Sequence, residues 1–325
     1  MIKALFSDPK KAEKVANRLL WTLFMIIFSG VLAFPVFVFF FRFIPPTYLP
    51  IGDGVRVDHV LTFIPVFFIV LYLALRIRVL LIYLTAGGMC VLLITGVMGY
   101  YGWSDLYNDY KTVVYNLKEG ARITYFSKAG VDVFPNASRI HGAIDFQNEG
   151  VRRYAVNAAV KNFGEYSKFT QNRKVVQYFS IFKEVRTKWV YVHDPSEDEF
   201  YSSASETVKL LEADGKFKGD CDDYSIMMAA SIKAVGGKVR LVRTTIVRPD
   251  RKVGHLYPEV MVGNTKDLEN LNYLIREVLF ETENKGKPIF YCKDADGSVW
   301  LNFDYNDAYP GGAYVSKLRR GALEI

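Results

Sequence analysis

The central segment of this 325-residue chain begins with Gly219-Asp220-Cys221-Asp222-Asp223-Tyr224. It continues with an apolar run that is rich in alanine and methionine, residues 226–235, and ends at Gly236-Gly237. Polar residues before an apolar run mark the start of a helix, and glycines after the run mark its end. The segment therefore predicts a buried helix that carries Cys221 in its first turn.

The flanking sequence predicts helices on the N-terminal side and strands on the C-terminal side. Apolar residues recur at helical spacing over 148–161 and 174–192, and a short helix opens at Ser205. Beyond the central helix, the pattern predicts strands over 239–247 and 255–262, a helix over 265–280, and a hairpin from 289–292 and 299–303. Pro258 within the second strand suggests a sheet edge or a bulge. Helices followed by an antiparallel sheet indicate an α+β fold.

Three residues are candidates for nucleophilic chemistry at this sheet. A cysteine at a helix N-terminus gains stabilisation of its thiolate from the helix dipole and free N–H groups, which favours Cys221 as a nucleophile. His255 begins the second strand after Cys221, residues 255–262, and could act as the base that accepts the thiol proton. Asp304 ends a later strand and could orient the imidazole. Spacing alone leaves open that Cys221 is an ordinary buried cysteine.

Three motifs in order strengthen this interpretation. The segment around Cys221 resembles the cysteine motif of bacterial transglutaminase-like domains. Gly254-His255-Leu256-Tyr257-Pro258-Glu259-Val260 resembles their histidine strand, and Trp300-Leu301-Asn302-Phe303-Asp304 their aspartate strand. The stretch 189–195, with Ser205-Glu206-Thr207, is similar to the segment that leads to the cysteine. Leu256-Tyr257-Pro258 departs from the small residue and Trp of many members, and 263–298 is a long insertion.

The resemblance implies a papain-like α+β domain with Cys221 as nucleophile, His255 as base and Asp304 as orienting group. Its active members form a thioester at an amide carbonyl, and other members are inactive. The implied function is thus a thiol enzyme acting on a protein or peptide, by hydrolysis or acyl transfer. The alternative is an inactive domain that serves as a scaffold in a membrane complex. The N–H of Cys221, Trp189 or Tyr191 could stabilise an oxyanion.

The first hundred residues predict a membrane anchor. Apolar runs predict about three transmembrane helices, at 19–43, 58–78 and 79–103, because a helix of about 20 apolar residues spans a bilayer. Residues 104–179 then form a connector and helical lead-in, and 180–325 the transglutaminase-like domain. No ionisable residue lies in the middle of a predicted crossing, which argues against a transporter.

Basic residues set the expected orientation. The N-terminal tail and the 76–78 link are rich in Lys and Arg, so both are expected in the cytoplasm. Three crossings then place 104–325 on the outer side of a membrane, the periplasmic side of a bacterial inner membrane. If the second and third runs form one re-entrant hairpin, the final side is reversed.

Charge and cysteine content limit the kinds of partner and cofactor that the sequence predicts. The net charge is +7, but residues 104–325 carry 32 basic and 30 acidic residues, too even a balance to favour nucleic acid. The three cysteines, Cys90, Cys221 and Cys292, are too few for a disulfide framework. No Cys/His spacing suggests zinc, and no cofactor is expected. The basic C-terminal residues, Lys317, Arg319 and Arg320, predict a small solvated tail.

Overall fold

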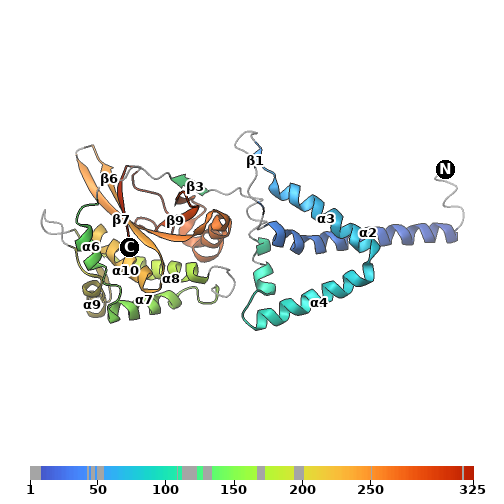
Figure 1. Cartoon of the computed structure of the whole chain (residues 1–325), viewed down its shortest axis with the longest axis horizontal. Helices are drawn as coiled ribbons and strands as arrows, with labels where there is room; N and C mark the ends of the chain where they lie inside the picture. Colours follow the sequence, from blue (N-terminus) through green and yellow to red (C-terminus); the bar gives the residue numbers. More distant parts are fainter. Residues whose placement is uncertain are drawn as a thin grey trace. The chain divides into compact units, whose positions relative to one another are not determined.

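The chain divides into two compact units, residues 1–114 and 115–325, in a computed structural model (Figure 1). The structure describes these residues: 9–41, 44, 48–49, 55–107, 109–111, 123–126, 134–166, 173–193, 201–249, 251–316 and 318–325. The predicted solvated tail includes Lys317, which lies outside the described residues.

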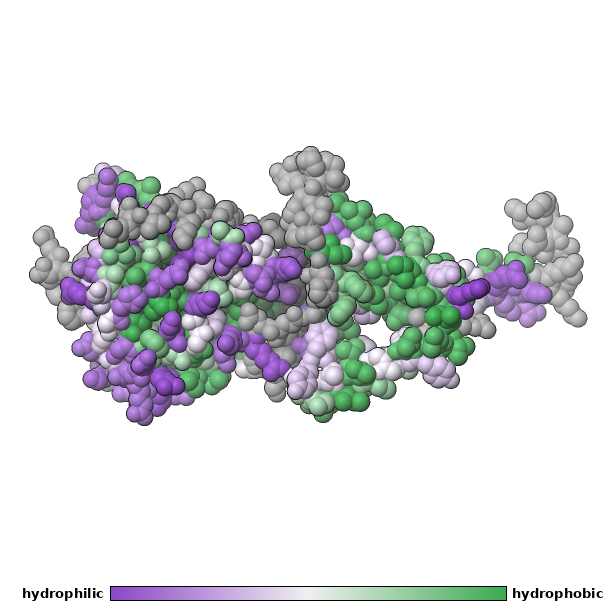
Figure 2. Space-filling view, viewed as in Figure 1, coloured by the Kyte–Doolittle hydropathy of each residue, from purple (hydrophilic) through white to green (hydrophobic). Residues whose placement is uncertain are grey.

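The first unit is built from long apolar helices. Its elements are helix α2 (Pro9–Phe41), the antiparallel strands β1 (Tyr48–Leu49) and β2 (Val55–Arg56), and helices α3 (Asp58–Arg76) and α4 (Arg78–Val97). Helices α2 and α3 pack together, and the rings of Phe37 and Phe63 meet edge to face at 5.5 Å. Most of the outer surface of these helices is hydrophobic (Figure 2).

Two helices of this unit are long and apolar enough to cross a membrane. These are Glu13–Phe40 and Asp58–Arg76, and helices of this kind act as membrane anchors or, near an N-terminus, as signal sequences. The third predicted crossing, 79–103, is helical only to Val97, and its apolar stretch Tyr83–Val97 is shorter. Length and composition therefore support two crossings and leave the third as a prediction.

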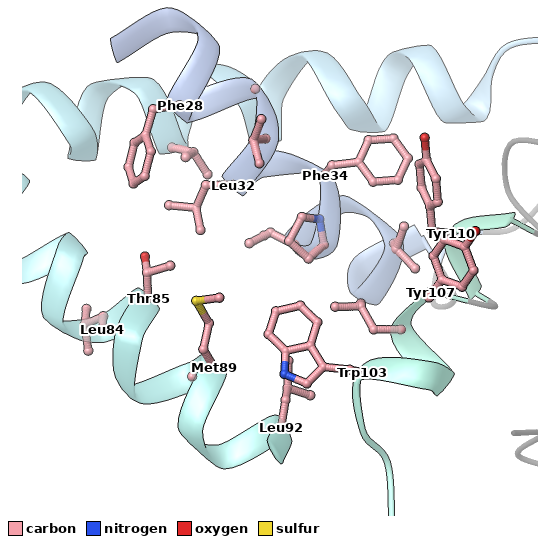
Figure 3. A pocket seen from close by; sticks show the side chains of 18 of the residues that line it. Phe28, Leu32, Phe34, Leu84, Thr85, Met89, Leu92, Trp103, Tyr107 and Tyr110 are labelled. Atoms are coloured by element: carbon pink, nitrogen blue, oxygen red, sulfur yellow. The ribbon is translucent and has the colours of Figure 1, made fainter. Parts of the chain in front are cut away.

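An apolar cavity of about 1070 Å³ lies within the first unit. Phe28, Leu32 and Phe34 line it from α2, and Met89 and Leu92 line it from α4 (Figure 3). Aromatic residues that follow α4 also contribute to its wall: Trp103, Tyr107 and Tyr110.

The second unit contains helices and a mixed sheet. Its helices are α6 (Ala137–Ala143), α7 (Glu149–Lys161), α8 (Arg173–Lys188), α9 (Ala204–Asp214), α10 (Cys221–Ala234), the 3₁₀ turn Thr265–Asp267, α11 (Leu268–Tyr273), the π-helical turn Leu274–Leu279 and α12 (Glu281–Asn284). Its strands are β3 (Ile123–Phe126), β4 (Trp189–Tyr191), β5 (Phe217–Gly219), β6 (Val239–Val247), β7 (Lys252–Asn264), β8 (Ile289–Lys293), β9 (Ser298–Asn302) and β10 (Arg319–Glu324).

The main sheet has the strand order β10-β6-β7-β9-β8-β3. All of its pairs are antiparallel except β3 with β8, so the predicted antiparallel sheet is correct apart from this edge strand. Strands β4 and β5 form a separate parallel pair. Pro258 lies in β7, an inner strand of the sheet, directly before Glu259, where the pairing with β9 begins, and the bulge in β7 falls later, between Met261 and Gly263.

The helices of the second unit lie against its sheet (Figure 1), and buried side chains from both form one hydrophobic core. Helix α10 lies at its centre, against β6 and β7, and residues 226–230 are fully buried. Helices α6 and α7 contribute Ile140 and Val151 to this same core. The expected start of the domain at residue 180 falls within α8, and the segments before it share the core of the domain.

The C-terminus is a strand with a buried arginine rather than a solvated tail. β10 pairs with β6, and the Arg319 guanidinium lies 2.6 Å from Glu259 of β7. Glu259 also binds Arg240 of β6 at 2.7 Å, and the side chains of all three residues are at most 2% exposed. The sequence-based expectation for Arg319 is therefore wrong, because this charge neutralises a carboxylate inside the sheet.

Substituting Glu259 with alanine should strongly destabilise the second unit. Arg240 and Arg319 would both lose a buried counter-charge, which typically costs about 3–5 kcal/mol of unfolding free energy. Urea unfolding of the full chain, followed by tryptophan fluorescence, measures this loss. Lys218→Ala is the control, because the Lys218–Asp214 pair is 48% and 43% exposed, and such pairs contribute about 1 kcal/mol or less. Equal losses of unfolding free energy in the two variants would contradict the stabilising role of Glu259 as a buried counter-charge.

Candidate active site

The site is built around the N-terminus of α10, which begins at Cys221 as the sequence predicts. Asp220 caps the helix, since its carboxylate accepts the N–H of Asp222 at 2.9 Å. Gly219 precedes this cap, and a Cβ there would lie within 2.4 Å of the Asp223 carboxylate. Asp223 in turn accepts the N–H of Ser202 at 2.8 Å, so the carboxylate is fixed and position 219 requires glycine.

The sulfur of Cys221 lies against the strand that carries His255. The backbone N–H of Leu256, the next residue in β7, hydrogen-bonds this sulfur. On its other side, the thiol donates to the Asp222 carboxylate at 3.6 Å. Cys221 is therefore placed beside the histidine strand by a backbone contact.

His255 and Asp304 form a buried pair. Nε2 of His255 lies 2.7 Å from Oδ2 of Asp304, and the two side chains are 4% and 2% exposed. The same carboxylate accepts the N–H of Tyr305 and the side-chain amide of Asn306, each at 2.7 Å. These contacts fix the carboxylate in one orientation, and the His255–Asp304 contact leaves Nδ1 as the ring nitrogen that can serve the thiol.

Two tyrosines border the sulfur. The rings of Tyr191 and Tyr305 lie 5.2 Å apart, and both side chains interact electrostatically with Cys221. Tyr305 also packs edge to face on His255 at 5.9 Å. Tyr191 is 38% exposed, so the site opens to solvent on its side.

Of the two predicted side-chain oxyanion donors, Tyr191 is the one that interacts electrostatically with Cys221, and its hydroxyl hydrogen-bonds with the Tyr305 side chain. The indole N–H of Trp189 donates to the carbonyl of Gly219 at 3.2 Å, and its ring packs on Phe217 and Tyr224 in the core. This bond links β4 to β5 and already uses the indole N–H, so the structure favours Tyr191 over Trp189, and the oxyanion role of Trp189 stays a prediction. Burial raises the pKa of Tyr191 to about 12, so its hydroxyl keeps its proton at neutral pH.

Residues 165–304 match the model of the transglutaminase-like superfamily, which ends at the aspartate of this site. The chain carries a transglutaminase-like domain. The match covers less than half of the 325 residues, and no curated protein matches the chain.

A solved structure from Cytophaga hutchinsonii, provisionally named a cysteine protease, is similar to this chain at 15% identity, with a TM-score of 0.30. The alignment covers 59% of this chain and 48% of that protein, so this chain spans about half of that protein's length.

The transglutaminase-like domain contains site residues that the sequence reasoning missed. Tyr305 directly follows Asp304, and Ser225 lies one helical turn after Cys221, where its hydroxyl contacts the carbonyls of Cys221 and Leu256. The position of Ser225 four residues after the cysteine was the available signal, because residues at this spacing share a helix face.

The described residues include one group that could offer three ligand atoms to a cation: Asp220, Cys221 and Asp222, whose atoms lie within 4.8 Å of one another. Asp220 caps α10, and Asp222 accepts a hydrogen bond from the Cys221 thiol. These two contacts account for the arrangement without an ion.

The electrostatics of the site hold the thiol protonated. Burial raises the pKa of Cys221 most strongly, and the negative charges of Asp222 and Asp220 raise it further. The Leu256 N–H lowers this pKa, but it is outweighed. The resting site therefore holds a neutral thiol at physiological pH.

Substituting Asp222 with asparagine should increase the reactivity of Cys221. Removing the nearest negative charge lowers the thiol pKa, and each unit of pKa raises the thiolate fraction about tenfold below that pKa. Alkylation by iodoacetamide at pH 7.5 should be about 3- to 10-fold faster than in the wild type.

Mass spectrometry of the peptide that contains Cys221 measures this rate, because Cys90 is exposed as well. Glu212→Gln is the control, since it removes an exposed carboxylate of α9. An unchanged or slower rate for Asp222→Asn would disprove the charge effect.

Proposed function

We propose that the chain is a membrane-anchored thiol enzyme that acts on amide bonds through a thioester on Cys221. The observation that carries the proposal is the buried His255–Asp304 contact of 2.7 Å, placed beside a cysteine at a helix N-terminus. A buried carboxylate that holds one imidazole nitrogen fixes the tautomer in which the other can accept a proton. The transglutaminase-like match over all three residues supports the same chemistry.

Proton transfer and attack occur in one step in the proposed mechanism. His255 Nδ1 takes the thiol proton as the sulfur attacks the amide carbonyl, and a C–S bond forms. The oxyanion accepts hydrogen bonds from the N–H of Cys221 and the hydroxyl of Tyr191. The C–N bond then breaks, and the leaving amine takes the proton from His255, which leaves a thioester on Cys221.

The second half of the reaction releases the acyl group. Water or an amine attacks the thioester carbonyl while His255 accepts its proton, and the departing sulfur recovers that proton. Attack by water gives hydrolysis, and attack by an amine gives acyl transfer. Asp304 keeps its charge throughout and stabilises the imidazolium. The opening beside Tyr191 favours an amide within a protein or peptide as substrate.

The apolar helices would hold this domain at a lipid bilayer. Helix α4 has 20 residues, which at about 1.5 Å each span about 30 Å, the thickness of a bilayer core. With α4 as a third crossing and Arg76 at the cytoplasmic side, the domain lies outside, in the periplasm of a bacterium. Partner proteins in the membrane would then bind through the first unit.

The protonated thiol favours a second candidate function. Asp220 and Asp222 disfavour a thiolate, which is the opposite of what a free-standing nucleophile requires. Under this alternative the domain is catalytically inactive and serves as a binding scaffold in a membrane complex. The two functions differ in whether the removal of the sulfur has any effect on turnover.

Replacing Cys221 with alanine should abolish amide cleavage, and Asp304→Asn should reduce it about 10⁴-fold because the imidazole loses its orienting charge. Hydrolysis of a fluorogenic peptide library, and ammonia release from glutamine-containing peptides, measure both activities in the full chain. Asp307→Asn, in the loop after Asp304, serves as the control. If wild-type protein and Cys221→Ala are equally inactive while both bind the same membrane partners, the scaffold function is correct.

Replacing Tyr191 with phenylalanine should lower kcat about 10²-fold and leave KM nearly unchanged, because the hydroxyl binds only the developing oxyanion. Steady-state kinetics on the best peptide give both constants. Tyr201→Phe is a matched control, because its hydroxyl contacts Asn136 outside the site. A change confined to KM would show that Tyr191 binds substrate and not the oxyanion.

A further inference from the structure

The histidine strand has an unpaired edge next to the nucleophile. β9 ends at Asn302, opposite Glu259. The last backbone hydrogen bond between these two segments runs from the Phe303 N–H to the Pro258 carbonyl, at 2.9 Å. The N–H and C=O groups of every second residue leave a strand on the same side. Both peptide groups of Leu256 therefore leave β7 on the β9 side, beyond the point where β9 can pair with them.

The first turn of α10 occupies this edge. The N–H of Leu256 bonds to the sulfur of Cys221, and the hydroxyl of Ser225 lies 3.1 Å from the Leu256 carbonyl. Cys221 and Ser225 are one turn apart, so they lie on the same face of the helix. Two side chains of one helical turn thus take the places of two missing ladder bonds.

Ser225 joins the helix and the strand directly. Its hydroxyl also lies 2.7 Å from the carbonyl of Cys221, and the side chain is fully buried. A bond to the carbonyl four residues earlier is common for serine in helices and would by itself indicate only local packing. The additional contact with β7 is different, since one hydroxyl proton is shared by carbonyls of the nucleophile residue and of the residue beside His255.

We propose that Ser225 is a positioning residue that holds the start of α10 against Leu256 and so keeps the Cys221 sulfur on the Leu256 amide, next to His255. This inference rests on the proposed function of Cys221 as nucleophile. Without the hydroxyl, a buried carbonyl of β7 loses its partner, and the helix start can move away from the strand edge. The sulfur then loses the N–H that favours its thiolate, and it moves away from the imidazole.

The rate of Cys221 alkylation as a function of pH tests the proposal in the full chain. Ser225→Ala should react about 3- to 10-fold more slowly at pH 7.5, with a pH midpoint about 0.5 to 1 unit higher, because less of the thiol is ionised. Ser231→Ala is the matched control: Ser231 is fully buried in the same helix, and its hydroxyl has no hydrogen-bond partner among the described residues. Its alkylation profile should equal that of the wild type.

A merely structural role predicts a different result. In that case Ser225→Ala melts at a lower temperature but keeps the wild-type midpoint, and this outcome overturns the proposal. If Ser225→Ala does not fold, Ser225→Thr and Ser225→Val are compared, because they have the same shape and differ in the hydroxyl. The pH midpoint of Cys221 alkylation should then be lower in Ser225→Thr than in Ser225→Val, and equal midpoints in the two variants overturn the proposal.

The outcome is separable from a failure of the proposed function. If Cys221 is not the nucleophile, Cys221→Ala retains the full peptide-cleaving activity of the wild type. If only the role of Ser225 is wrong, Cys221→Ala is inactive while Ser225→Ala and Ser231→Ala alkylate with the same profile.

Discussion

The site depends on a helix start that docks on the unpaired edge of a strand. β7 continues beyond the end of β9, and its Leu256 peptide groups bond to Cys221 and Ser225 of α10. Pro258 lies at the end of this pairing: its carbonyl accepts the Phe303 N–H, and proline has no N–H of its own to donate toward Phe303. The backbone of β7 thus sets the position of the Cys221 sulfur relative to His255.

The buried ion cluster supports this strand from within the sheet. Residues 255, 257 and 259 alternate onto one face of β7, so His255, Tyr257 and Glu259 lie in a row. Glu259 is clamped by arginines from β6 and β10, and the Tyr257 ring stacks on the imidazole at a centroid distance of 6.0 Å. An ion cluster of this kind contributes little net stability but resists the loss of any one member. Glu259 lies two residues from Tyr257 along β7, and Tyr257 lies against His255. The C-terminal strand β10 is thereby connected to the position of His255.

Local patterns predicted the elements of this fold, and non-local contacts decided what they missed. The strand over 239–247 and the helix that begins at Cys221 were predicted at the bounds that the structure has, because alternation and capping are local signals. The pairing of His255 with Asp304 was expected from motif order and lies at 2.7 Å. The solvated position expected for Arg319 was wrong because its partner, Glu259, is 60 residues away. The bond of the Trp189 indole N–H to the Gly219 carbonyl, 30 residues away, was not foreseen for the same reason. The parallel pairing of β3 with β8 could not be predicted for the same reason.

The acidic neighbours of Cys221 determine how such a thiol could work. A helix terminus and the Leu256 N–H favour the thiolate, but burial and the carboxylates of Asp220 and Asp222 have the larger effect on its pKa. The resting cysteine is then a neutral thiol, and not the thiolate of many cysteine enzymes. In the proposed mechanism, ionisation of the thiol would therefore accompany attack on the carbonyl, with His255 as general base in that step. A thiol that stays protonated until substrate arrives is also slow to oxidise, because oxidants react with the thiolate. This property is consistent with the proposed location on the outer side of a membrane, where no cytosolic reductant would restore an oxidised cysteine.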